Sequence, residues 1–169
     1  LHDTGRKLFP VINKKMNRYI QNLLKINEYQ ADKIRQDYWM SYGSTLKGLI
    51  RNYDVNPNNF LNKTHDIKNY SDLIFPAYNL VRILSNLDGR KILFTNAPKI
   101  YALNIINHCN IGRFFQDFHF IENSNFNGKP SKESMKKFLS KYRIEQAYIV
   151  DDEKENLQVA KCWGIKNIW

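Results

Sequence analysis

Short apolar runs alternate with helical patterns in the second half of this chain. The clearest run is residues 147–150 (AYIV), which is followed directly by two carboxylates, Asp151 and Asp152. A short apolar run with an abrupt polar end is typical of a buried parallel strand. Residues 153–163 then show helical spacing, and Gly164 is placed to end that helix. The pattern predicts a strand whose carboxyl end carries an acidic pair.

Three further strands are expected on the same grounds. Residues 92–94 (ILF) stop at a Thr-Asn pair, residues 118–121 (FHFI) precede a polar loop, and residues 165–169 (IKNIW) follow the last helical pattern. Helical patterns separate these runs, and strand–helix alternation favours parallel pairing because each helix crosses over the sheet. The sequence after residue 91 therefore predicts an α/β fold. We expect residues 92–94 and 147–150 to lie in one parallel sheet.

In the first half of the chain, the apolar residues recur with the period of a helix and not of a strand. Apolar positions keep helical spacing over residues 12–24, 31–50 and 77–84. Gly43 can interrupt the second of these patterns, and the Asn-rich residues 54–62 are typical of a loop. A helical region is thus predicted before the α/β region.

The composition is that of a globular protein. Of the 169 residues, 43% are hydrophobic and 25% are charged, which is ordinary for such chains. No apolar run has the length of a membrane span and no signal-peptide pattern is present, so we expect a cytoplasmic protein without a membrane partner. Cys109 and Cys162 match no metal-binding spacing, and we expect them to be buried free thiols.

The formal net charge of +10 would suit an anionic partner such as nucleic acid or a phosphorylated metabolite. The lysines are scattered, however, and no run of five or six like charges occurs. We favour a coding bias spread over a solvated surface, and consider a nucleic-acid partner the weaker interpretation.

Polar side chains are expected at three ends of strands or loops: Thr95 and Asn96, Lys129, and the pair Asp151 and Asp152. In an open parallel sheet such ends share one edge, which is where ligands bind. A hydroxyl, an amide, a cation and an acidic pair suited to Mg²⁺ form a set that can handle phosphate. Taken singly, each has an ordinary alternative as a turn, a helix cap or a solvated loop residue.

These residues also carry a resemblance to a known family. Three segments resemble motifs II, III and IV of the haloacid-dehalogenase-like (HAD) hydrolases: residues 91–98 (KILFTNAP), 128–131 (GKPS), and 148–157 (YIVDDEKENL) with 160–164 (AKCWG). The opening residues 1–5 (LHDTG), residues 42–46 (YGSTL) and residues 64–65 (TH) look like the pyrimidine 5′-nucleotidase-like branch of that family. The resemblance covers essentially the whole chain.

The resemblance implies a role for each candidate residue. Thr95 would hydrogen-bond the transferring phosphoryl group, with Asn96 beside it holding phosphate or substrate. Lys129 would offset charge on the nucleophile and the phosphoryl oxygens. Asp152 would bind Mg²⁺ directly, while Asp151 would ligate through water or orient the ligands. The implied fold is a Rossmann-like parallel sheet with an inserted helical cap.

The same resemblance implies domain boundaries and a missing motif. Residues 1–8 would begin the core, residues 9–86 would form the helical cap, and residues 87–169 would form the α/β core. Motif I, an Asp-x-Asp-x-Thr at the end of the central strand, supplies the nucleophile and the acid in the family, and it would stand just before Leu1. We therefore expect a fragment or a gene product with a misplaced start.

Three functions remain open at this point, the weakest of which is a nucleic-acid-binding module that rests on the net charge alone. The first is an Mg²⁺-dependent phosphatase that acts on nucleoside monophosphates or similar small phosphate esters, through an aspartyl-phosphate formed by a residue upstream of Leu1. The second is a catalytically inactive HAD relative that binds an anion or a protein partner. In either case we expect residues 1–169 alone to be inactive, because the remaining groups include no suitably placed nucleophile.

Overall fold

The computed structural model describes residues 2–168, with the side chains of residues 5–166 and 168. The chain divides into two compact units. The helical unit contains residues up to 90 together with residues 100–114, and the α/β unit contains residues 91–99 and those from 115 onward. This division reflects packing, and the domain boundaries expected at residues 8 and 86 stay predictions.

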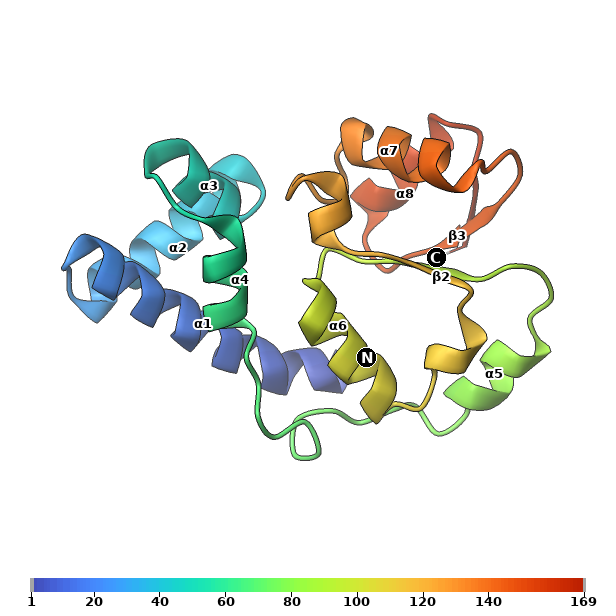
Figure 1. Cartoon of the computed structure of the whole chain (residues 1–169), viewed down its shortest axis with the longest axis horizontal. Coiled ribbons are helices and arrows are strands. Elements are labelled where there is room, and N and C mark those ends of the chain that lie inside the picture. Colours follow the sequence, from blue (N-terminus) through green and yellow to red (C-terminus); the bar gives the residue numbers. More distant parts are fainter. Residues whose placement is uncertain (1, 169) are drawn as a thin grey trace. The chain divides into compact units, whose positions relative to one another are not determined.

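The helical unit consists of successive helices, with short connections between the first four and a longer non-helical segment at residues 65–79 (Figure 1). They are α1 (His2–Leu24), α2 (Glu28–Tyr42), α3 (Thr45–Asn52), α4 (Pro57–Thr64), α5 (Leu80–Asn86) and α6 (Lys99–His108), with a short 3₁₀ helix η1 (Gly112–Phe114). Asn27 caps α2 by accepting a hydrogen bond from the Gln30 amide, and Gly43 ends it at a φ of 75°. The helical pattern expected over residues 31–50 is therefore two helices.

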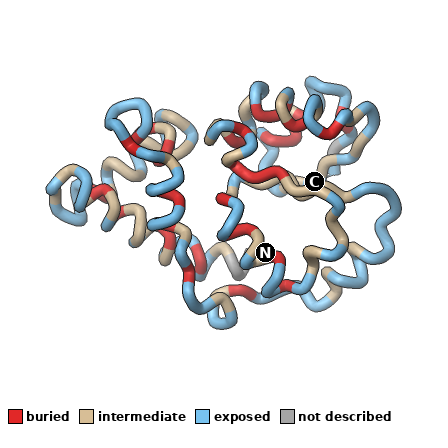
Figure 2. The backbone as a smooth tube through the Cα atoms, in the orientation of Figure 1, coloured by how far each residue is buried: buried red, intermediate tan, exposed pale blue. Residues whose placement is uncertain are grey.

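Apolar side chains from α1 to α4 form the core of the helical unit. The side chains of Ile20, Leu49 and Phe60 are fully buried there. Helices α2 and α3 approach closely at Gly48, where a Cβ atom would lie 2.3 Å from the Cγ atom of Tyr38. Only a residue without a side chain fits this contact without a shift of the helices. Figure 2 shows buried positions in this unit interspersed with exposed ones.

The α/β unit contains two pairs of parallel strands and the helices between them. Its elements are β1 (Ile92–Phe94), β2 (Asp117–His119), the 3₁₀ helix η2 (Ile121–Ser124), α7 (Lys132–Tyr142), β3 (Tyr148–Val150), α8 (Lys154–Lys161) and β4 (Lys166–Ile168). Strand β1 pairs with β2, with Leu93 opposite Phe118, and β3 pairs with β4. The α/β class and the parallel pairing agree with the sequence prediction.

The expectation of a single continuous sheet is wrong for the described residues. Strands β1 and β3 belong to two separate two-stranded sheets. A strand that joins the two sheets would have to pair with both β1 and β3, and residues 2–168 contain no such strand. Without that strand, β1 and β3 have no common neighbour through which to share hydrogen bonds.

Helix α7 packs against both sheets and joins them. Met135, Phe138 and Tyr142 from α7 form a buried cluster with Ala160 and Ile165. Side chains of Ile92, Phe94 and Ile149 also pack against this cluster, so β1 and β3 share one core. The rings of Phe94 and Phe138 are stacked with 4.3 Å between centroids. The core of the α/β unit thus holds the two strand ends that carry the candidate residues.

The opposite face of β3 carries exposed apolar side chains. Tyr148 is 67% exposed and Val150 is 72% exposed, whereas Ile149 packs inward. Successive strand residues point to opposite faces, so this pattern means that only one face of β3 is covered by described residues.

Three local expectations are corrected by the structure. Residues 57–62 are not a loop, because Pro57–Thr64 form α4, which has Pro57 in its first turn and is capped by the Asn56 side chain accepting from the Asn59 amide at 3.0 Å. Residues 120–121 are not part of a strand, because β2 ends at His119 and the chain turns into η2. Cys162 is exposed, whereas Cys109 is buried as expected, and both thiols are free. Cys162 follows the last turn of α8 and lies off the buried face formed by Leu157 and Ala160.

Among the described residues, no helix combines the length and apolar character needed to cross a membrane.

His119, at the end of β2, is fully buried in this core. Its Nε2 atom shares a 2.9 Å hydrogen bond with the Ser124 hydroxyl, while Nδ1 has no partner among the described residues. Burial lowers the pKa of the His119 imidazole to about 4, and the nearby Lys141 ammonium adds to the effect. The imidazole is therefore neutral in the folded protein at pH 7.

His119 should make the stability of the α/β unit fall as the pH decreases. The unfolded chain binds a proton at His119 near pH 6.5 and the folded chain only near pH 4, so the contribution is present above pH 6.5 and is lost towards pH 4. In His119→Phe, the drop in unfolding free energy between pH 7 and pH 4.5 should shrink by about 1 to 2 kcal/mol. Urea unfolding followed by circular dichroism measures this drop. An identical drop in both proteins would contradict the lowered pKa of His119 in the folded protein.

Candidate active site

Thr95 and Asn96 follow β1 directly. The Thr95 amide extends the pairing of β1 with β2 by donating to the His119 carbonyl oxygen at 2.9 Å. The Thr95 hydroxyl oxygen accepts a hydrogen bond from the Ala97 amide at 3.1 Å. This contact fixes the turn and leaves the hydroxyl proton available for donation to a ligand.

Asn96 holds the loop that carries Lys129. Its side-chain amide donates to the Lys129 carbonyl oxygen at 2.8 Å, and its side-chain oxygen accepts from the Lys129 amide at 2.7 Å. Gly128 allows this close approach, because a Cβ there would lie 2.3 Å from the Asn96 side-chain oxygen. Asn96 was expected to hold phosphate or substrate, and in the structure its side chain holds the main chain of Lys129.

Lys129 and Asp151 form a buried ion pair. The Nζ atom lies 2.5 Å from Oδ2 of Asp151, and the side chains are only 12% and 6% exposed. The other oxygen of Asp151 accepts hydrogen bonds from the Asn156 side chain at 2.8 Å and from the Glu153 amide at 3.0 Å. Lys129 also lies 5.0 Å from the ring centroid of Phe94. The ion pair thus links the loop after η2 to the end of β3.

The surroundings keep Asp151 ionised. Burial alone would raise the pKa of this carboxyl, but the hydrogen bonds from Lys129 and Asn156, the charge of Lys129 and the Glu153 amide lower it overall. Both oxygens of Asp151 are engaged by these partners. A carboxylate in this state suits the orientation of neighbouring groups better than direct binding of a cation.

Asp152 differs from its neighbour because it is exposed. It makes no hydrogen bond or ion pair with any other described residue, so its oxygens are available to a ligand. Oxygen donors of this kind suit Mg²⁺, which uses one or two carboxylates with waters and phosphate oxygens. No group of three or more His, Cys, Asp or Glu side chains suited to a metal occurs among the described residues. The carboxylate oxygens of the acidic pair are the type of ligand that Mg²⁺ prefers, and they provide part of a magnesium site.

The structure therefore brings Asn96, Lys129 and Asp151 into one hydrogen-bonded network, with Asp152 at its exposed side. Thr95 follows the same strand as Asn96. The catalytic, substrate-binding and metal-binding roles expected of these five residues stay predictions. Sequence reasoning missed Asn156, a buried polar residue in the first turn of α8. Its position five residues after Asp151, beside the apolar face of that helix, was the available signal.

Comparison with known proteins gives a family match and a curated relative. The family model described as "Haloacid dehalogenase-like hydrolase" matches residues 9–169. "Phosphate metabolism protein 8" of Saccharomyces cerevisiae is 21% identical over 191 aligned positions, which cover 99% of this chain and 57% of that protein. The chain thus spans little more than half the length of this curated relative.

Two solved structures are also similar to this chain. A hydrolase from Streptococcus pneumoniae TIGR4 is 21% identical with a TM-score of 0.44, over 94% of this chain and 83% of that one. A candidate phosphatase from Clostridium difficile is 19% identical with a TM-score of 0.49, over 92% and 77% of the two chains. The nucleotidase-like branch stays a prediction.

Removal of Lys129 should destabilise the α/β unit, because it leaves the Asp151 carboxylate buried without its cation. We expect Lys129→Met to lower the unfolding free energy by about 3 kcal/mol at pH 7. Lys137→Met is the matched control, since its pair with Glu133 is 3.1 Å long but largely exposed, and it should cost less than about 0.5 kcal/mol. Urea unfolding at pH 7 measures both losses.

A double variant separates the loss of the pair from the loss of packing. Lys129→Met combined with Asp151→Asn removes both charges and keeps an acceptor for Asn156, so it should be more stable than Lys129→Met alone. Equal losses for Lys129→Met and Lys137→Met would show that the buried pair is not important for stability.

Proposed function

Because the chain belongs to the haloacid dehalogenase-like hydrolase family, we propose that its α/β unit forms the phosphate-binding part of an Mg²⁺-dependent phosphomonoesterase. The observation that carries the proposal is the buried pair of Lys129 and Asp151 beside the exposed Asp152, at the carboxyl end of β3. A fixed cation next to a free carboxylate is what a phosphate ester and its metal ion require.

Each residue has a defined task in this proposal. Lys129 stabilises charge on the phosphoryl oxygens, and Asp151 fixes the position of its ammonium group. Thr95 donates its hydroxyl proton to a phosphoryl oxygen. Asn96 keeps the loop of Lys129 in place through its two hydrogen bonds to the main chain. Phosphoryl transfer depends mainly on such positioning and charge compensation.

The acidic pair would hold Mg²⁺. Asp152 is the direct ligand and Asp151 acts through water or by orienting its neighbours, because both Asp151 oxygens are already engaged. When bound, Mg²⁺ would offset negative charge on the phosphate. The residues present supply the type of donor that this ion prefers, and the remaining donors would be water and phosphate oxygens.

The nucleophile lies outside the described residues in this proposal. A carboxylate upstream of Leu1 attacks phosphorus, the bond from phosphorus to the ester oxygen breaks, and the leaving alkoxide takes a proton from a neighbouring acid. Water then attacks the aspartyl-phosphate, which releases phosphate and restores the carboxylate. Asp151 is unsuited to this task, because its charge is held by Lys129 and by two hydrogen-bond donors.

The proposed substrate is a small phosphorylated metabolite, such as a nucleoside monophosphate. The resemblance of residues 1–5, 42–46 and 64–65 to the pyrimidine 5′-nucleotidase-like branch supports this choice. The curated relative is described as a phosphate metabolism protein, which is compatible with a phosphate ester as substrate.

The site can be tested in protein expressed with the coding sequence upstream of Leu1. Asp152→Asn and Lys129→Ala should each reduce Mg²⁺-dependent hydrolysis of p-nitrophenyl phosphate and nucleoside monophosphates by about 10²-fold or more. Asp151→Asn should cost less. Glu155→Gln, an exposed acid on α8, is the matched control and should retain wild-type turnover. Wild-type turnover in Asp152→Asn would refute the proposal, and turnover in no protein would favour the inactive, anion-binding relative.

Residues 1–169 expressed alone should not hydrolyse these esters, even with Mg²⁺. The remaining groups at the strand ends are Thr95, Asn96, Lys129 and the acidic pair, and none is a free nucleophile with an acid partner. The same esters would be assayed, with Asp152→Asn as the control for contaminating phosphatase. Mg²⁺-dependent turnover that disappears in this control would place a nucleophile within residues 1–169.

A further inference from the structure

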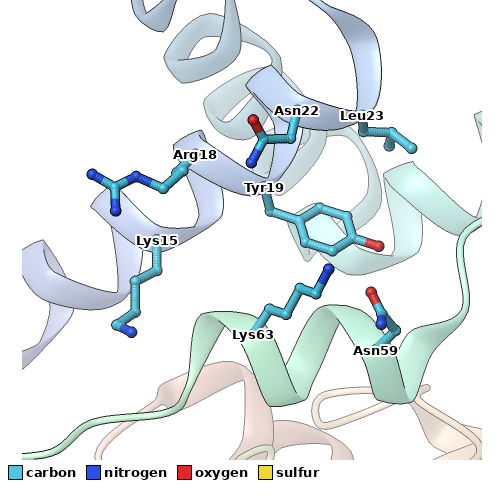
Figure 3. A pocket seen from close by; sticks show the side chains of 7 residues that line it. All are labelled: Lys15, Arg18, Tyr19, Asn22, Leu23, Asn59 and Lys63. Atoms are coloured by element: carbon cyan, nitrogen blue, oxygen red, sulfur yellow. The ribbon is translucent and has the colours of Figure 1, made fainter.

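A pocket of about 330 Å³ lies between α1 and α4 of the helical unit (Figure 3). Three cationic side chains line it, namely Lys15 and Arg18 from α1 and Lys63 from α4. Its size is at the lower end of the range found for sites of small ligands, about 300 to 1,000 Å³. None of these residues has a part in the function proposed above.

The helical period gathers these side chains on two facing surfaces. Lys15, Arg18 and Asn22 are three and four residues apart on α1, so they share one face of the helix. Asn59 and Lys63 are four residues apart on α4 and face them. Figure 3 shows Lys63 and Asn59 near the Tyr19 ring, with Lys15 and Arg18 extending farther along α1.

Tyr19 gives the pocket a fixed wall. Its ring packs edge-on against the fully buried Phe60, with 5.0 Å between the centroids. Lys63 lies over the same ring, with its Nζ atom 5.9 Å from the centroid. Burial raises the pKa of Tyr19, so its hydroxyl stays protonated and can donate a hydrogen bond.

Among the residues whose side chains are described, none balances the positive charge of the pocket. No carboxylate lines the pocket, and no described Asp or Glu forms an ion pair with Lys15, Arg18 or Lys63. Elsewhere in the same unit, Arg35 is paired with Asp32 at 2.8 Å. Three like charges around one small space repel each other, and a bound anion would relieve that repulsion.

We propose that this pocket binds the phosphoryl dianion of a small phosphorylated metabolite. Lys15, Arg18 and Lys63 contact the phosphoryl oxygens, and Arg18 can donate two parallel hydrogen bonds to them. The side-chain amide of Asn22 or Asn59 and the Tyr19 hydroxyl provide further donors. Three cations match a dianion better than a singly charged carboxylate.

The organic part of the ligand would lie towards Leu23. Figure 3 shows Lys15 and Arg18 at one end of the pocket and Leu23 at the other. Leu23 is 37% exposed and offers an apolar surface next to the Tyr19 ring. The two cations of α1 lie at one end, the Lys63 ammonium lies near the Tyr19 ring, and Leu23 adds apolar atoms at the other end, an arrangement that suits a phosphate joined to a compact sugar or base.

Isothermal titration calorimetry of residues 1–169 tests the proposal, with inorganic phosphate and uridine monophosphate as separate probes. We expect saturable binding of one equivalent at low salt, weaker binding at physiological salt, and the tighter binding for the nucleotide. Arg18→Ala and Lys63→Ala should each weaken binding by about tenfold, the usual cost of a lost charge-assisted hydrogen bond. Both side chains are exposed, and circular dichroism verifies the fold.

Two control variants make the result specific. Lys14→Ala removes the same charge from the exposed side of α1 and should keep the wild-type affinity to within about twofold. Lys161→Ala removes an exposed charge from α8, in the unit that holds the proposed active site, and should also keep it. Tighter binding of inorganic phosphate than of the nucleotide would mean that free phosphate is the ligand.

Three results would overturn the proposal. The first is the absence of saturable binding. The second is an equal loss in Lys14→Ala, or a loss in Lys161→Ala with none in Arg18→Ala. The third is much tighter binding of a single-stranded oligonucleotide than of the mononucleotide, which would make the pocket part of a nucleic-acid surface.

Discussion

The ion pair between Lys129 and Asp151 is the interaction on which the candidate site depends. A charge removed from water is costly unless a counter-ion and hydrogen bonds replace the water, and here Asp151 has Lys129, Asn156 and the Glu153 amide. These contacts connect a loop, a strand end and a helix that are far apart in the sequence. They also leave Asp152 outside the network, so two adjacent carboxylates acquire different chemistry from their surroundings alone.

The class of fold and most residues of the network around Lys129 and Asp151 could be predicted from the sequence. The hydrogen bonds that connect these residues could not. Apolar runs ending in polar residues located β1 and β3, and helical spacing with Gly43 located the helix boundary. Asn96 was assigned to the ligand because its type suits phosphate, yet its partner is a main chain 33 residues away. Such a partner depends on tertiary contacts that no local pattern encodes. The expected single sheet was wrong because a short apolar run predicts a strand and not its neighbours.

Scattered positive charge can be concentrated by folding. The lysines follow no run in the sequence, which favoured an interpretation as general surface charge. Helices α1 and α4 nevertheless bring Lys15, Arg18 and Lys63 to one pocket, because residues three and four apart share a helix face and two helices can face each other. Charge patterning along a chain therefore underestimates charge clustering in space. The same effect hides an acidic or basic site in any helical bundle.

The one-sided pairing of β1 and β3 has a consequence for where residues 2–168 can take up another strand. Each of these strands bonds to one described neighbour only, and β3 adds exposed Tyr148 and Val150 on one face. A free row of backbone donors and acceptors next to apolar side chains is a template on which other extended chains add. An extended segment that pairs with this row would cover it, so the open edges of β1 and β3 are the places where another strand can be added.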